Sequence, residues 1–191
     1  MARWQPDGRG RLVQAALALY GERGFESTTV AEIAQRAGLT ERTFFRHFPD
    51  KREVLFAGGT EMQELLLSTV ADAPESAAPI DAAAAGLAAV AAELQGRREF
   101  ARERQAVIAA NPELQERELI KLASWAEAIA DTLRHRGVGE PAASLAAEVA
   151  IAVFRATFAR WIDEDDAPEL PQLLRESFDR GLSEVTSAPA R

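Results

Sequence analysis

The segment LTERTFFRHFPDK, from Leu39 to Lys51, brings basic and aromatic side chains together in a chain where rings are otherwise sparse. Its basic groups belong to Arg42, Arg46 and Lys51, and its rings, counting the imidazole, to Phe44, Phe45, His47 and Phe48. Guanidinium and ammonium groups bind phosphate oxygens and base edges, whereas aromatic rings either fill a core or lie against a nucleic acid. The combination points to nucleic-acid binding, provided that the surrounding elements present the charges on one face.

The sequence lacks the usual patterns of catalysis and metal binding. There is no cysteine, and the two histidines are His47, inside the segment, and His135, near the end of a predicted helix. No phosphate-binding loop, nucleophile elbow or zinc-spaced pair occurs. We interpret the acidic run DEDD at 163–166, in a predicted loop before Pro168, as solvated charge rather than a metal site. We therefore predict a protein that is not an enzyme and that needs no metal and no cofactor.

The net charge of −8 conceals an asymmetry between the two ends of the chain. Residues 1–55 carry nine Lys and Arg against seven Asp and Glu, whereas residues 56–191 carry thirteen against twenty-three. A mildly basic head can face a polyanion while an acidic body is repelled by it. For the body alone, solubility explains the acidic surface equally well.

Targeting signals are not apparent in the sequence. The N-terminal stretch MARWQPDGRGRLVQ has no apolar core of a signal peptide, and the run AAAAGLAAVAA is too short and too weakly apolar to cross a bilayer. We expect a cytoplasmic protein with no membrane partner.

Helical periodicity and alanine dominate the chain, which predicts an all-α fold of about nine helices. The first helix should end near Gly21–Gly24. The second starts at Thr29-Val30-Ala31-Glu32, which has the form of a capping box, and the third should run from Glu41 to His47. Asp50 is expected to open a fourth helix, with a kink or a break at Gly58-Gly59 before it continues over 60–70. The remaining helices are expected at 81–95, 97–110, 112–136, 141–163 and 169–186.

The second and third helices, joined by AGLT, predict a helix-turn-helix in which Gly38 occupies the tight turn. Phe44 and Phe48, at i and i+4, should point into the core. The outward side of the third helix then presents Arg42, Thr43, Phe45, Arg46 and His47. Such a helix lies in the major groove of DNA, with its N-terminal residues at base edges and flanking groups on phosphates.

The stretch TTVAEIAQRAGLTERTFFRHFPDKREVL resembles the DNA-binding signature of the TetR family of bacterial transcriptional regulators, over about residues 11–55. The resemblance implies a homodimer with a helix-turn-helix DNA-binding domain at 1–55 and an effector-binding and dimerisation domain at 56–191. It further implies a ligand-responsive regulator, with repression as the expected mode. Such a regulator binds a near-palindromic double-stranded DNA operator and is released by a small-molecule effector.

The resemblance also assigns DNA contacts to particular residues. Thr29 and Thr40 match cap residues that meet phosphate, and Arg42 and Thr43 match the base-reading positions. The further phosphate contacts match His47 and Lys51.

Two residues of the third helix, Arg46 and Phe45, each allow two alternative roles. Arg46 is either a DNA contact or a solvated helix charge. At Phe45 the family usually has tyrosine, whose hydroxyl reaches a phosphate, and phenylalanine cannot make that bond. We expect Phe45 to pack on a sugar or on a thymine methyl in the groove; the alternative is packing against the first helix as core.

In the C-terminal part, the segment 141–163 is apolar around much of its circumference and must be covered on several sides. Pairing it and the 169–186 helix with the same two helices of a second subunit gives a four-helix bundle. The candidate interface residues are Leu145, Val149, Phe154, Phe158, Trp161, Leu170, Leu174 and Phe178. The alternative is that these side chains form only an intramolecular core.

An effector pocket is expected among the fourth to seventh helices, because pockets combine aromatic walls with a few polar groups. The candidates are Met62, Phe100, Arg104, Ile108 and Trp125. For any single one of them, ordinary core is the favoured assignment. The competing functions are an enzyme or an all-α small-molecule-binding protein with no DNA role, and the latter would leave the clustered basic groups of the head without a common purpose.

Overall fold

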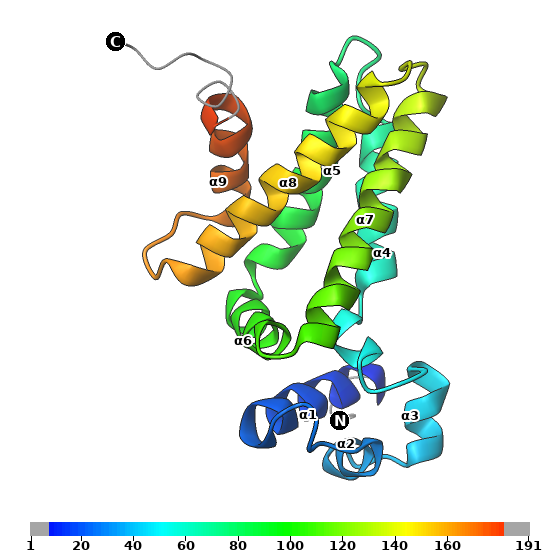
Figure 1. The fold of residues 1–191 in the computed structure, drawn as a ribbon, viewed down its shortest axis with the longest axis vertical. Helices are drawn as coiled ribbons and strands as arrows, with labels where there is room; N and C mark the ends of the chain where they lie inside the picture. The colour runs from blue at the N-terminus through cyan, green and yellow to red at the C-terminus, as the bar shows by residue number, and fades with distance from the viewer. Residues whose placement is uncertain (1–7, 182–191) are drawn as a thin grey trace, which may run out of the picture. The chain divides into compact units, whose positions relative to one another are not determined.

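The computed structural model describes residues 8–181, and every regular element in that range is a helix (Figure 1). The predicted all-α fold is confirmed, with nine α-helices, one 3-10 turn and one π-helical turn among the described residues. The chain forms two compact units. The first unit contains the chain through Gly59 together with Glu103–Arg117, and the second contains Thr60–Arg102 together with the chain from Glu118 onward. The prediction of separate domains at 1–55 and 56–191 had placed residues 103–117 with the second domain.

The first unit begins with three helices whose ends follow local sequence signals. They are α1 (Gly8–Arg23), α2 (Val30–Arg36) and α3 (Glu41–His47). The predicted capping box of α2 is present, because the Thr29 side chain accepts from the backbone N–H of Glu32 and the Glu32 carboxylate accepts from the backbone N–H of Thr29. Gly38 has a φ of +66°, in the left-handed region that the predicted turn requires.

The fourth predicted helix differs from the expectation. Asp50 does cap the next element, since its carboxylate accepts from the backbone N–H groups of Arg52 and Glu53. That element is a single 3-10 turn, Glu53–Phe56, and α4 begins only at Gly59 (Gly59–Ala71). Val54, Leu55 and Phe56 are all buried. Three consecutive residues cannot share one face of a long α-helix, so the chain turns tightly here and restarts after Gly58, whose φ is +85°.

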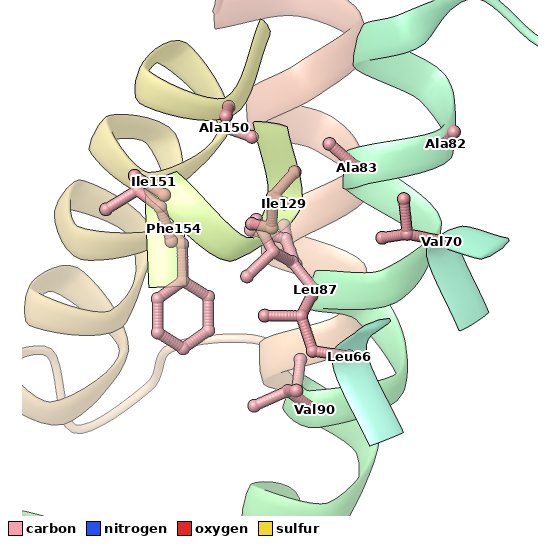
Figure 2. Close-up of a cluster of buried hydrophobic side chains, with 14 of the residues drawn as sticks. Leu66, Val70, Ala82, Ala83, Leu87, Val90, Ile129, Ala150, Ile151 and Phe154 are labelled. Atoms are coloured by element: carbon pink, nitrogen blue, oxygen red, sulfur yellow. The ribbon is translucent and has the colours of Figure 1, made fainter. Parts of the chain in front are cut away.

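The second unit is built around α5. Its helices are α4, α5 (Pro79–Gln95), the first part of α6 (Arg98–Ala109), most of α7 (Pro112–His135), α8 (Ala142–Asp163) and α9 (Leu170–Glu176), followed by a π-helical turn, Ser177–Gly181. α5 packs against both α8 and α9. Figure 2 shows side chains of α4, α5, α7 and α8 meeting in this core, including Leu66, Leu87, Ile129 and Phe154. The end of the predicted 169–186 helix lies outside the described residues.

Gly86 brings α4 and α5 unusually close together. A Cβ at this position would lie 2.7 Å from the backbone carbonyl oxygen of Leu66 and 2.7 Å from a methyl group of Val70. The contact with the carbonyl oxygen cannot be relieved by a rotamer change, so any larger residue must push the two helices apart. The position of α4, which follows the first unit directly in the chain, therefore depends on glycine at residue 86.

α8 is the most apolar long helix of the described chain. Its length and composition meet the criteria for a membrane span, a test that core helices of globular proteins also pass. Only 33% of its most apolar window is buried among the described residues. Much of the apolar surface of this helix is therefore not covered by the described part of the chain.

Candidate nucleic-acid interface

The orientation of α3 is fixed by the inward packing of its aromatic residues. Phe44 is completely buried and Phe48 is 3% exposed, with their ring centroids 5.7 Å apart. Ile33 and Ala34 of α2 are buried beside them, and the backbone N–H of Leu39 donates to the carbonyl of Ala34 at 2.8 Å across the turn. α3 therefore cannot roll without exposing the two rings.

The opposite face of α3 carries the side chains that were predicted to lie there from the sequence. Arg42, Phe45 and Arg46 are exposed, whereas Thr43 and His47 are half-buried. The Phe45 side chain is 55% exposed and makes an edge contact with Phe44, 5.5 Å between ring centroids. The alternative of Phe45 as a core residue is therefore incompatible with the structure.

The caps of the two helices use their hydroxyl groups internally. The Thr40 side chain accepts from the backbone N–H of Thr43 at 3.2 Å and lies 3.0 Å from the Thr43 hydroxyl. The Thr29 hydroxyl donates to the Glu32 carboxylate at 2.9 Å. These hydrogen bonds from Thr29, first from its backbone and then from its side chain, lower the pKa of Glu32. The carboxylate of Glu32 is therefore held in its ionised form.

Ion pairs between α1 and α2 use two of the first unit's arginines. Arg23 pairs with Glu32 at 2.8 Å, and Arg36 pairs with Glu22 at 2.6 Å. Within the described chain, neither Arg42 nor Arg46 has a carboxylate partner. These two guanidinium groups lie on the outer face of α3.

Lys51 has a different environment from the one that the sequence implied. Its ammonium group donates to the backbone carbonyls of Phe25, Glu26 and Thr28, at 2.9, 3.2 and 3.1 Å. It also lies 4.4 Å from the ring centroid of Phe25. An ammonium has three N–H donors, and these carbonyls accept all of them. A phosphate contact by Lys51 would have to replace one of these internal bonds.

The connection after α3 is held from both sides. The Tyr20 hydroxyl of α1 donates to the Lys51 carbonyl at 2.6 Å, and burial, with a smaller contribution from Asp50, raises its pKa. On the other side, Arg104 donates to the Leu55 carbonyl at 2.6 Å, and its guanidinium lies over the Phe56 ring. The 3-10 turn is therefore fixed between α1 and the 103–117 segment of the same unit.

The predicted effector residues divide between the two units. Arg104 and Ile108 belong to the first unit, where Arg104 holds the 3-10 turn and Ile108 is fully buried. Met62, Phe100 and Trp125 belong to the second unit, where all three are half-buried. Met62 and Trp125 pack against its apolar core.

The predicted interface residues also separate into two groups. Leu145 and Val149 of α8 are 60% and 37% exposed. Phe158 and Phe178 are half-buried. The other four are buried in the apolar core of the second unit; they are Phe154, Trp161, Leu170 and Leu174.

The first unit also contains a groove that was not predicted from the sequence. It is open, has a volume of about 750 Å³ and runs between the C-terminal half of α1 and the C-terminal half of α6. Leu17, Phe25 and Val107 contribute apolar surface, while Glu22 and Glu103 contribute carboxylates. The groove could not be predicted because it requires two segments some eighty residues apart to pack together.

A three-helix unit with an exposed basic face on its third helix, joined to a larger helical unit, defines the class of helix-turn-helix DNA-binding proteins. Residues 12–57 match the family described as bacterial regulatory proteins of the tetR family, and residues 77–185 match the MftR C-terminal domain. The chain belongs to the TetR family of transcriptional regulators, with a C-terminal domain of the MftR type that spans more than half of its length.

Individual relatives agree with this assignment. The putative mycofactocin biosynthesis transcriptional regulator MftR of Mycobacterium tuberculosis is 28% identical over 168 residues, covering 86% of this chain and 84% of that protein. The HTH-type transcriptional regulator TcmR of Streptomyces glaucescens is 35% identical over 82 residues, which are 43% of this chain and only 36% of TcmR. FadR of Thermus thermophilus, a TetR family repressor solved with lauroyl-CoA, has a similar fold, with a TM-score of 0.58 at 23% identity over 96% of this chain and 98% of that one.

The carbonyl contacts of Lys51 lead to a stability prediction. Lys51→Met keeps most of the side-chain volume over Phe25 but leaves three carbonyls without their donor, so we expect it to lower the free energy of unfolding by about 1–3 kcal/mol. Urea denaturation of the purified protein measures this. The control is Arg46→Met, an exposed residue of the same unit, for which a change within about 0.5 kcal/mol is expected. Equal stability of Lys51→Met and the unchanged protein would show that the carbonyl contacts contribute nothing.

Proposed function

We propose that this protein is a ligand-responsive repressor that binds a near-palindromic DNA operator as a homodimer and leaves it when a small molecule binds. The observation that carries the proposal is the outer face of α3. Arg42, Phe45 and Arg46 are exposed there, while the rings of Phe44 and Phe48 on the opposite face are buried in the core. The family match over residues 12–57 supports the same role for this face. We further propose that the protein acts in the cytoplasm.

In this proposal, α3 enters the major groove with its N-terminal end toward the bases. Arg42 reads base edges, with guanine as the preferred partner of a guanidinium fork. Thr43 is the second base-reading residue, with its hydroxyl hydrogen-bonded to Thr40 before DNA arrives. Phe45 covers a sugar or a thymine methyl, and its exposed ring supports that role because it has little other contact.

In the proposed complex, further residues bind DNA phosphates and so position the base-reading residues of α3. His47 lies at the C-terminal end of α3 and is half-buried, which supports a phosphate contact at the border of the proposed interface. Arg46 is the exposed neighbour on the same helix. Contacts of this kind strengthen binding to every sequence alike, whereas base contacts discriminate among sequences.

Dimerisation is proposed through the uncovered side of α8. Six exposed apolar residues recur there with alternating spacings of three and four, the pattern of a helix–helix seam: Ala142, Leu145, Val149, Ala152, Ala156 and Ala159. The charged residues Glu148, Arg155 and Arg160 are also exposed on this helix and border the stripe. The small alanines permit close approach, while Leu145 and Val149 supply apolar area. A second copy of the chain carries the same apolar stripe on its own α8, so the two stripes can pack together in a symmetric contact. We include no membrane in the proposal, because a second subunit can cover this stripe.

Effector binding is proposed in the second unit, with Met62, Phe100 and Trp125 as candidate contacts. The signal must then reach the first unit, and α6 offers a route besides the chain at Gly58-Gly59. Arg102 of α6 donates to the Ile162 carbonyl at 2.7 Å and to Asp165 at 3.0 Å. Two residues later, Arg104 holds the 3-10 turn of the first unit. One continuous helix is thus anchored to both units.

The rival functions receive less support. An enzyme or a ligand carrier without a DNA role gives no reason for the exposed Arg42 and Arg46, and the relatives reported above are transcriptional regulators. The groove between α1 and α6 lies in the first unit rather than where the effector is proposed. A regulator remains the function that uses the features of both units.

DNA binding is tested by selecting duplexes from a random library with purified protein. We expect a near-palindromic consensus and, if the dimer neutralises about 6–10 phosphates, an affinity that falls roughly 10³–10⁵-fold between 50 and 200 mM salt. Arg42→Ala should change the preferred bases at a cost of about 1–3 kcal/mol, whereas His47→Ala should weaken binding to selected and scrambled duplexes by the same factor. An unaltered consensus with Arg42→Ala would contradict the proposed orientation of α3, and no enrichment at all would contradict the function.

The dimer contact is tested with a matched pair of leucines. Leu145→Glu places a carboxylate in the proposed α8 stripe twice per dimer, so we expect the dimer dissociation constant to rise roughly 100-fold or more. Leu119→Glu makes the same change on α7, at a side chain that is 50% exposed, and should leave the dimer intact. Sedimentation equilibrium of both variants measures the effect. Equal dissociation constants for the two variants would remove α8 from the interface.

Coupling through α6 is tested by hydrogen exchange with and without duplex DNA. In the unchanged protein we expect DNA to protect residues 41–47 directly and also to alter exchange around residues 162–166, which Arg102 holds. Arg104→Ala should abolish the distant change while the protection of 41–47 persists. A distant change that survives in Arg104→Ala would argue against α6 as the route, and its absence in the unchanged protein would do so as well.

A further inference from the structure

The groove between α1 and α6 of the first unit is apolar at its base. The apolar residues that lie deepest in it are 2–9% exposed: Leu17, Tyr20, Phe25 and Val107. Small residues line both walls. A Cβ added to Gly21 on the α1 side would meet no neighbouring atom within 4 Å, and Ala106 on the α6 side is exposed. The space of about 750 Å³ is within the range of pockets that hold small organic molecules.

The charged side chains that line the groove are all acidic. Glu22 is neutralised by Arg36, 2.6 Å away. Glu26 and Glu103 are exposed and form no ion pair among the described residues. They belong to opposite walls, Glu26 to the segment after α1 and Glu103 to α6. Two carboxylates beside an apolar base attract a positive charge and repel a negative one.

We propose that this groove binds an amphiphilic organic cation, a small molecule in which a charged centre carries aromatic or alkyl groups. The apolar groups occupy the base of the groove, where they leave water. The charged centre lies between Glu26 and Glu103, which supply the charge complementarity. This site is separate from the effector site proposed in the second unit, and its occupation does not require DNA.

The walls of the groove are connected to the elements that follow α3. Lys51 donates to the carbonyls of Phe25 and Glu26, and the Tyr20 hydroxyl donates to the Lys51 carbonyl. In the α6 wall, Arg104 holds the 3-10 turn before α4. A ligand that changes the separation of the two walls is therefore expected to act on the connection between α3 and α4.

The charge requirement is tested with two probes of the same shape and opposite charge, tetraphenylphosphonium and tetraphenylborate. Each is titrated by calorimetry into the purified protein without DNA. We expect tetraphenylphosphonium to bind, and Glu26→Gln combined with Glu103→Gln to raise its dissociation constant about 10-fold without strengthening the binding of tetraphenylborate by less than it weakens the cation. The control is Glu113→Gln with Glu116→Gln, which removes two exposed carboxylates from the same unit outside the groove and should leave both probes unaffected.

The position of the probe is tested by filling the groove. Ala106→Trp places a large side chain in it from α6 and should abolish the binding of tetraphenylphosphonium. Ala109→Trp makes the same change at an exposed position of the same helix outside the groove and should have no effect. Gly21→Trp fills the groove from the α1 wall and replaces Ala106→Trp if thermal melts show that variant to be unfolded.

Three results would overturn the inference. The first is binding of tetraphenylphosphonium that survives in the folded groove-filling variants, because the probe would then occupy another site, such as the one proposed in the second unit. The second is equal weakening by the Glu113 and Glu116 control, which would reflect net charge rather than a contact. The third is no measurable binding to the unchanged protein. Each of these results leaves the proposed DNA-binding function untouched.

Discussion

The burial of Phe44 and Phe48 is the constraint on which the presentation of α3 depends. Both rings project from one side of a seven-residue helix, and together they remove that side from solvent. A helix this short has little stability of its own, because nucleation is costly and few hydrogen bonds repay it. Its existence and its roll angle are therefore set by the same packing. Arg42 and Arg46 point outward because the neighbouring positions on the helix point inward.

Cations in the first unit serve two different purposes, and their surroundings decide which. Lys51 lies near the ends of α1 and α2, where backbone carbonyls converge, and it neutralises their partial charge. Arg23 and Arg36 join α1 to α2 through carboxylates. Exposed pairs of this kind contribute little to stability, typically less than about 1 kcal/mol each. Each pair is neutral as a whole, so Arg23 and Arg36 add no net positive charge to the surface of the first unit.

Features that depend on neighbouring residues could be predicted from the sequence. The capping box at Thr29, the left-handed turn at Gly38 and the inward pair Phe44 and Phe48 each follow from spacings of four residues or fewer. The inward position of the two rings also predicted which residues of α3 face outward. Phe45 is exposed, in agreement with the favoured prediction that it is not a core residue. The environment of Lys51 could not be predicted, because its carbonyl partners lie more than twenty residues away in the chain. The same holds for the core position of Trp161, since an apolar helix does not reveal which of its faces a partner covers.

The division of α6 between the two units has a physical consequence for any movement of one relative to the other. Arg102 and Arg104 are two residues apart on one helix, yet the first is bound to the end of α8 and the second to the 3-10 turn before α4. A regular α-helix does not bend between adjacent turns unless a proline, a glycine or an inserted group breaks its hydrogen bonds, and the sequence of α6 contains neither proline nor glycine. Movement therefore has to be absorbed at the ends of the helix, in its arginine contacts, rather than within it. The contacts of Arg102 are to the carbonyl of Ile162 in the last turn of α8 and to an exposed aspartate, whereas Arg104 is half-buried over Phe56. The more solvated end should yield first, so α6 is expected to remain with the first unit when the end of α8 shifts.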